Sequence, residues 1–143
     1  MAYFLAETAG SESAAARACI AAARALRTAM EDVATRSGLR PDVVLRFGLR
    51  WGAGDYVGQI LTRARAEVTA LGDEVNEAAR IEACASGGRA LASKALIERL
   101  EPRDIAALDI DIDHLAYTPL RDLATATEKA RRDAPLIAVC AIS

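Results

Sequence analysis

Apolar and polar positions along the chain alternate between a helical period and an extended one. Residues 11–38 are predicted to form a long helix, which Ser11 or Ser13 is suited to begin and Gly38 to end. Within it, apolar residues recur at spacings of four, three, four and three, which places them on one helical face. They are Cys19, Ala23, Leu26, Met30 and Val33. This face is predicted to lie against the core.

Short apolar or alternating runs predict strands before and after this helix. Residues 1–5, MAYFL, predict a strand inside the sheet although they open the chain. After a turn at 39–42, residues 43–52 alternate, so that Arg46, Gly48 and Arg50 share one face. Further strands are expected at 53–60, 68–72, 89–93, 114–123 and 136–142. Residues 61–67 are expected to be a polar connection, 94–100 a short helix and 124–135 a loop or helical turn, while 101–113 have little pattern.

A second helix is predicted from Asp73, which can cap it. At about 100° per residue, one stripe of this helix is apolar and faces the sheet. The stripe consists of Val75, Ala78, Ile81 and Ala85. Asn76 and Arg80 fall on the opposite side, one above the other. The pair is either solvated or reaches a phosphate, and the spacing alone leaves both interpretations open.

The order of elements predicts one α+β domain over residues 1–143, with a sheet on one side and helices on the other. No repeat, linker or low-complexity stretch divides it.

Charge and composition exclude several kinds of protein. A net charge of −2 and a pI near 5.5 argue against a protein that binds nucleic acid regardless of sequence, which needs a basic face. They leave room for a nucleotide site with a few local cations. Cys19, Cys84 and Cys140 lie far apart among apolar neighbours and are expected to be buried thiols, and a single histidine argues against zinc. Without a membrane-spanning run or a basic signal segment, we expect a cytoplasmic protein away from membranes.

Residues 71–93, LGDEVNEAARIEACASGGRALAS, resemble the signature of class III adenylate and guanylate cyclases. In that family, a strand ends in a glycine turn and a helix with an asparagine and an arginine follows. The matching residues are Gly72, Asp73, Val75, Asn76, Ala78, Arg80, Ile81, Glu82, Gly88, Leu91 and Ser93. Residues 47–60 resemble the family's glycine-spaced strand pair more loosely, with Gly48, Gly52 and Gly58 as counterparts.

The resemblance implies a ferredoxin-like βαββαβ core with helices packed on a mainly antiparallel sheet. It also implies conversion of ATP to 3′,5′-cyclic AMP and pyrophosphate, with ATP favoured over GTP as the nucleoside triphosphate. Asn76 would orient the ribose, and Arg80 would stabilise negative charge on the phosphate in the transition state. Thr69 occupies the position of a residue that reads the base, although it is equally an ordinary strand residue. Lys129 is a candidate for the terminal phosphates, with Arg131 and Arg132 beside it.

The chain departs from the family at the metal site. Family members hold two Mg²⁺ or Mn²⁺ ions with two early aspartates, in a segment that would precede Met1. The aspartates of this chain do not match those positions, and the DIDID run at 109–113 is interpreted as a solvated edge with Ile110 and Ile112 inward. The domain is therefore expected to lack the family's first strand and metal-binding segment, and to be inactive alone.

Three interpretations remain open. The first is an enzyme, a nucleotidyl cyclase, with adenylate cyclase favoured. The second is a non-catalytic cyclase-homology protein that dimerises or binds nucleotide. Because family active sites form between two subunits, a homodimer is expected, and a remnant could still complement a whole partner. The third is an unrelated ferredoxin-like binding module.

Overall fold

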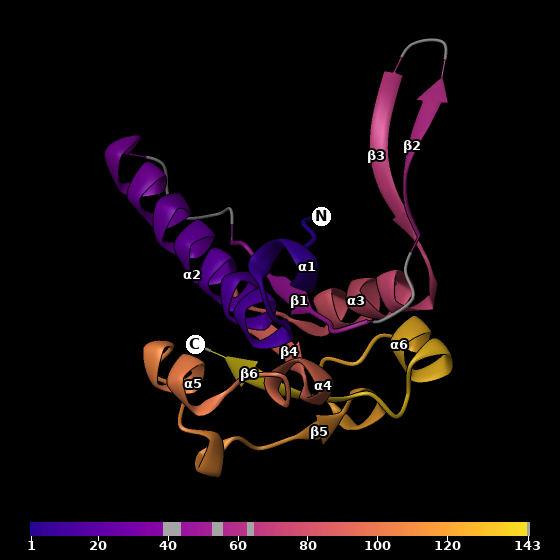
Figure 1. Cartoon of the computed structure of the whole chain (residues 1–143). Helices are drawn as coiled ribbons and strands as arrows, with labels where there is room; N and C mark the ends of the chain where they lie inside the picture. The colour runs from indigo at the N-terminus through magenta and orange to yellow at the C-terminus, as the bar shows by residue number, and fades with distance from the viewer. Residues whose placement is uncertain (39–43, 53–55, 63–64, 143) are drawn as a thin grey trace.

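The computed structural model describes residues 1–38, 44–52, 56–62 and 65–142 of the chain. A four-stranded sheet forms the centre of the molecule (Figure 1). Its strands run in the order β1 (Phe47–Leu49), β4 (Ala90–Ser93), β6 (Ala138–Ile142) and β5 (Thr118–Pro119). β1 and β4 are parallel, and the other two pairings are antiparallel. The sheet is thus mainly antiparallel, as expected.

Helices cover both faces of this sheet, whereas one helical layer was expected. Successive residues of β4 point to opposite faces, so Ala90 and Ala92 join one apolar cluster and Leu91 joins another. The first cluster includes Ile20 of α2 (Glu12–Arg36), and the second includes Ile81 of α3 (Asp73–Cys84). The remaining short helices are α1 (Ala6–Ala9), α4 (Lys94–Ile97), α5 (Pro102–Ala107) and α6 (Glu128–Asp133), with 3₁₀ turns η1 (Ile112–His114) and η2 (Leu120–Asp122).

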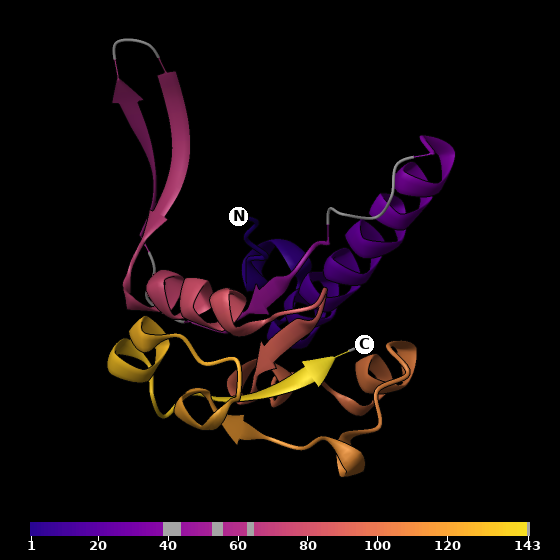
Figure 2. The ribbon, with the colours of Figure 1, turned by 180° about the vertical axis from the view of Figure 1, so that it is seen from behind.

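A β-hairpin projects away from the body of the molecule (Figures 1 and 2). It consists of β2 (Tyr56–Thr62) and β3 (Arg65–Leu71), which pair antiparallel out to Thr62 and Arg65. The polar connection expected at 61–67 is therefore wrong, because the ladder is built from backbone groups that every residue but proline supplies. In the described residues, the hairpin forms a sheet of its own, apart from the central one.

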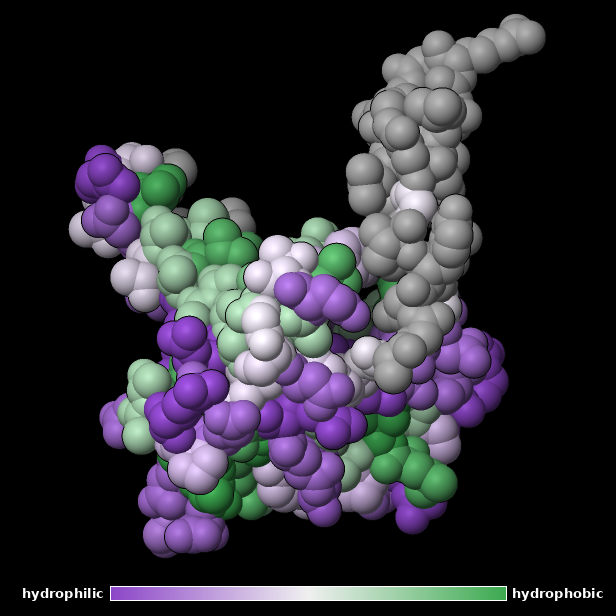
Figure 3. Space-filling view, viewed as in Figure 1, coloured by the Kyte–Doolittle hydropathy of each residue, from purple (hydrophilic) through white to green (hydrophobic). Residues whose placement is uncertain are grey.

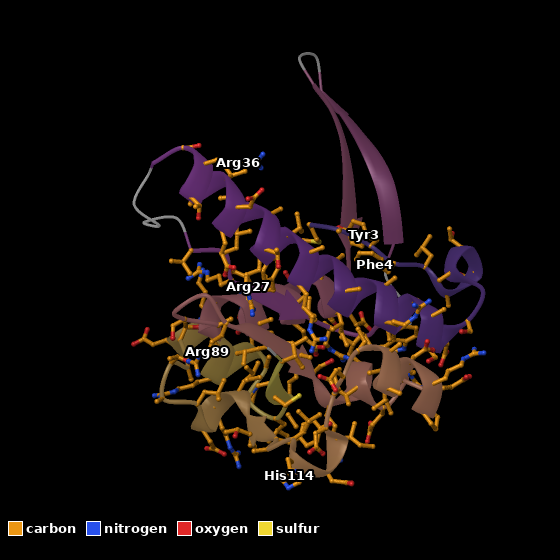
Figure 4. The ribbon with its side chains drawn as sticks, turned by 90° about the vertical axis from the view of Figure 1, so that its left-hand side faces the viewer. Tyr3, Phe4, Arg27, Arg36, Arg89 and His114 are labelled. Atoms are coloured by element: carbon orange, nitrogen blue, oxygen red, sulfur yellow. The ribbon has the colours of Figure 1, made fainter. Side chains whose placement is uncertain are left out.

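Residues 1–5 form no strand, so this prediction is wrong. The Leu5 carbonyl accepts a hydrogen bond from the Ala9 backbone N–H at 2.9 Å, which turns the chain directly into α1. Met1 is 84% exposed and Leu5 53%, while Tyr3 and Phe4 are half-buried beside α2 (Figure 4). An apolar run predicts burial, but a strand also needs a neighbour for its backbone, which no strand of the described chain supplies here.

The long helix is confirmed, but its apolar stripe is buried for only half its length. The Ser11 hydroxyl accepts from the Ala14 backbone N–H at 3.0 Å, so Ser11 is the cap of the two candidates. Burial extends to Ala23, whereas Leu26 is 53% and Val33 45% exposed. A helix of this length measures about 37 Å, and its outer half extends past the sheet. Figure 3 shows apolar residues exposed on this part of the helix, and Figure 4 shows Arg36 near its end.

The structure tests two smaller expectations, and a third falls on residues that it does not describe. The strand expected at 114–123 shortens to Thr118–Pro119, because Pro119 has no N–H to donate and turn η2 follows it directly. Residues 101–113, without a clear pattern, contain α5, and Ile112 in the DIDID run is 45% exposed rather than inward. The turn expected at 39–42 lies outside the described residues.

The cysteines behave as buried thiols, as predicted. Cys84 and Cys140 are buried, Cys19 is partly buried, and none forms a disulfide. Burial raises the pKa of Cys19 from 9.0 to about 11, and that of Cys140 also rises to about 11, mainly through burial. The Cys19 and Cys140 thiols therefore stay protonated at neutral pH and act as small apolar side chains in the core.

Candidate functional site

Helix α3 places Asn76 and Arg80 on its outer side. Its inner side buries Ile81, Cys84 and Ala85 between β4 and α6, while Val75 and Ala78 of the predicted stripe are half-buried. Asn76 is exposed, and the Arg80 side chain is 24% exposed. The prediction that the two residues look away from the core is confirmed.

A hollow of about 430 Å³ lies at this side of α3. It is lined by Asp73, Asn76, Glu77, Arg80, Asp133 and Ala134. The first four come from α3, Asp133 ends α6 and Ala134 follows it. The structure thus brings Asn76 and Arg80 together in one concave site, with α6 as the opposite wall.

Arg80 forms an ion pair with Asp133 across the hollow. Its Nε donates to Asp133 Oδ2 at 3.1 Å. Arg132 donates from Nε to the other carboxylate oxygen of Asp133 at 2.6 Å. The hydrogen bond from Arg132, supported by Arg80, lowers the pKa of Asp133, although desolvation opposes the shift. The carboxylate therefore stays charged between two guanidinium groups.

β1 fixes the position of α3 through the face that carries Arg46, Gly48 and Arg50. Arg50 Nε pairs with Glu77 Oε2 at 2.7 Å, and Arg46 pairs with Glu82. Between the two arginines, Gly48 lies so close to the backbone of α3 that an added Cβ would be 2.3 Å from the Glu82 nitrogen. The alternation of β1 predicted that these three residues share a face, but it did not predict that α3 covers that face.

The other predicted site residues either do not line the hollow or have side chains that the structure does not describe. Thr69 lies in β3 with its backbone opposite Gly58, and its side chain is not among those described. Lys129 and Arg131 are exposed on α6, and neither lines the hollow. Their assignments to base and terminal phosphates remain predictions.

Sequence reasoning missed Asp133 and Glu77. Asp133 lies 53 residues from Arg80 in the chain, so helical spacing could not connect them. Glu77 follows Asn76 directly and belongs to the matched segment, but no feature of the sequence marked it as the partner of Arg50.

Metal ligands do not gather in the described part of the chain. Over residues 1–38, 44–52, 56–62 and 65–142, no three histidine, cysteine, aspartate or glutamate side chains are placed to share an ion. Asp109, Asp111 and Asp113 are all exposed, and Asp55 lies outside the described residues.

The same fold occurs in the crystal structure of the adenylyl cyclase CyaB from P. aeruginosa. The two structures align with a TM-score of 0.63 over 93% of this chain and 61% of that chain, at 20% sequence identity. This chain has an adenylyl cyclase fold. The expected ferredoxin-like core, with helices on a mainly antiparallel sheet, is confirmed by this likeness. No protein-family model matches the chain, and no curated protein sequence does.

The alignment covers less than two thirds of the CyaB chain, so it supports the fold and leaves the activity to be argued from the site. In the part of the chain that the structure describes, no helix combines the length and apolar character needed to cross a bilayer.

Proposed function

We propose that this chain is a class III nucleotidyl cyclase-like domain that binds the ribose and phosphates of ATP at Asn76 and Arg80. The observation that carries the proposal is the hollow beside α3. It holds these two residues one helical turn apart on an adenylyl cyclase fold. The segment that carries them is also the one that resembles the cyclase signature.

The proposed chemistry is intramolecular phosphoryl transfer. The ribose 3′-oxygen bonds to the α-phosphorus and loses its proton, the bond from this phosphorus to the bridging oxygen breaks, and pyrophosphate leaves with the electron pair. The Asn76 amide would hold the ribose so that the 3′-oxygen faces the phosphorus. Arg80 would donate to the α-phosphate oxygens as they gain charge, because a guanidinium remains charged and offers a planar fork of donors.

No three possible metal ligands among the described residues are placed to share an ion, and we propose that the complete site is shared with a second subunit. Mg²⁺ or Mn²⁺ bound by that subunit would polarise the phosphates and activate the 3′-oxygen. The exposure of Asn76 on the outer side of α3 suits a site that is closed by a partner. The partner would be a second copy or a whole cyclase subunit, and sedimentation velocity showing only monomer at high micromolar concentration would argue against the second copy.

Binding of ATP to the purified chain tests the nucleotide site separately from turnover. The wild-type chain is expected to bind ATP in isothermal titration calorimetry, and Asn76→Ala to weaken binding by roughly tenfold, because a buried polar contact with the ribose is lost. Asn76 is exposed, so this change should leave unfolding by urea unaltered.

The control is Glu98→Ala, because Glu98 forms an exposed pair with Lys94 at 3.6 Å and does not line the hollow. It should bind ATP as the wild type does. Unaltered binding by Asn76→Ala would remove the ribose role. Binding without turnover in the presence of a cyclase partner would favour the alternative function, a non-catalytic nucleotide-binding protein.

A further inference from the structure

Asp133 accepts a hydrogen bond from the Nε side of the Arg80 guanidinium group. The only hydrogen bond of the Arg80 side chain to a described residue is the one from Nε to Asp133 Oδ2, at 3.1 Å. Neither Nη nitrogen bonds a described residue, and Arg80 lines the hollow. Because a guanidinium group is planar, fixing the Nε edge also fixes the direction in which both Nη groups can donate.

The Asp133 carboxylate is itself held in place. Arg132 Nε donates to Oδ1 at 2.6 Å, and Arg132 Nη2 donates to Oδ2 at 3.2 Å. The contact of α6 with α3 and the buried Ala130 and Ala134 on either side of Asp133 fix the backbone. Asp133 is therefore an exposed carboxylate that accepts hydrogen bonds from two arginines, Arg80 and Arg132.

We propose that Asp133 is a positioning residue for Arg80, which orients the guanidinium so that its Nη groups face the phosphates of a bound nucleotide. The inference rests on the proposed function, because it takes Arg80 as the phosphate-binding group. Asp133 acts through Arg80 and has no contact with the nucleotide of its own. The low pKa of Asp133 keeps the acceptor charged at neutral pH.

Two other roles of Asp133 predict different results. As a competitor that occupies the phosphate position, Asp133 would weaken nucleotide binding, and its removal would tighten it. Electrostatic repulsion alone would also make removal of the Asp133 charge tighten nucleotide binding, because a carboxylate in the hollow repels phosphate. The observed geometry favours positioning, since the carboxylate takes the Nε edge and leaves the two Nη groups free of described partners. The sign of the change in affinity thus separates positioning from competition.

The test is a double-mutant cycle on the purified chain, with the affinity for a methylanthraniloyl ATP analogue measured by fluorescence. Asp133→Asn keeps the shape of the side chain but removes its charge, and is expected to weaken binding roughly tenfold. Arg80→Ala should weaken it by at least as much. In the Arg80→Ala background, Asp133→Asn should not weaken binding further, because there is no guanidinium left to orient.

Two further variants separate orientation from general damage to the structure. Asp133→Glu keeps the acceptor and should recover part of the lost affinity. Asp122→Asn is the matched control, because Asp122 also follows an arginine and pairs with it, at 3.6 Å from Arg121, but does not line the hollow. This control should bind the analogue as the wild type does. Urea unfolding of each variant shows whether the fold is retained.

Each possible result supports or contradicts the positioning role of Asp133. Unchanged or tighter binding by Asp133→Asn, or effects of Asp133→Asn and Arg80→Ala that add in the double variant, would overturn the positioning role while leaving the nucleotide site intact. Failure of the wild-type chain to bind the analogue would instead overturn the proposed function, and this inference with it.

Discussion

Replacing Arg80 by alanine is expected to lower kcat for cyclic AMP formation roughly 10²-fold to 10³-fold, as measured for removal of one preorganised donor to a developing anion. The change is to be made in an assembly of this chain with a cyclase subunit that supplies metal carboxylates. Arg80 is half-buried in the hollow beside Asn76, where its charge is less screened by water than at the open surface. Initial rates at saturating ATP measure the effect.

The control for this change is Arg103→Ala. Arg103 is 73% exposed and pairs with Glu101 at the start of α5, and its removal should leave kcat unchanged. Arg80→Lys should lie between wild type and alanine, because lysine keeps the charge but not the planar fork of donors. A rise in KM with kcat unchanged would contradict the assignment, since it would make Arg80 a group that binds ground state and transition state equally.

Gly48→Ala is expected to destabilise the fold by about 3 kcal/mol, at the upper end of overpacking effects. The added Cβ would lie 2.3 Å from the Glu82 nitrogen, 2.5 Å from the Ala78 oxygen and 2.8 Å from the Glu82 Cα. All three are backbone atoms of α3, so no side chain can rotate away and the whole helix must shift. Urea unfolding measures the loss, and the affinity for ATP should fall as well, because α3 carries Asn76 and Arg80.

The matched control is Gly87→Ala, which also adds one Cβ to a glycine, but at a position with open space around it. Nothing lies within 4 Å of the Cβ that would be added there, but the φ angle is +66°. Alanine in this left-handed conformation should cost about 1 kcal/mol. If Gly48→Ala lowered the free energy of unfolding no more than Gly87→Ala does, the close packing of α3 on β1 would be contradicted.

Local periodicity was enough to predict the elements whose side chains alternate between core and solvent. The helical stripe of α3 predicted both the burial of Ile81 and Ala85 and the outward direction of Asn76 and Arg80. The alternation of β1 placed Arg46, Gly48 and Arg50 on one face. These patterns succeed because burial imposes them residue by residue.

Features that depend on a distant partner were beyond the reach of the sequence. MAYFL has the composition of a strand, but pairing needs a neighbouring backbone, and the chain turns into α1 instead. The outer half of α2 repeats the apolar spacing of the inner half, yet it extends past the sheet, and Leu26 and Val33 are exposed. The ion pair of Arg80 with Asp133 joins α3 to α6 and depends on how the two helices pack.

The candidate site was therefore predicted in part. Asn76 and Arg80 share one hollow because they belong to one helix. Asp133, which holds Arg80, comes from an element that the sequence left open as a loop or helical turn. Lys129, a candidate through the resemblance to the cyclase family, lies exposed on the same helix as Asp133 without lining the hollow.

Cyclic AMP formation by mixed subunits tests the central claim most directly. The purified chain is combined with an adenylyl cyclase whose own catalytic arginine has been replaced by alanine, in the presence of ATP and Mn²⁺. Each protein alone is expected to form little or no cyclic AMP, and the mixture to form it readily, because one composite site pairs the partner's metal carboxylates with Asn76 and Arg80 of this chain. A mixture no more active than the variant cyclase alone, or robust cyclic AMP formation by this chain alone, would contradict the account.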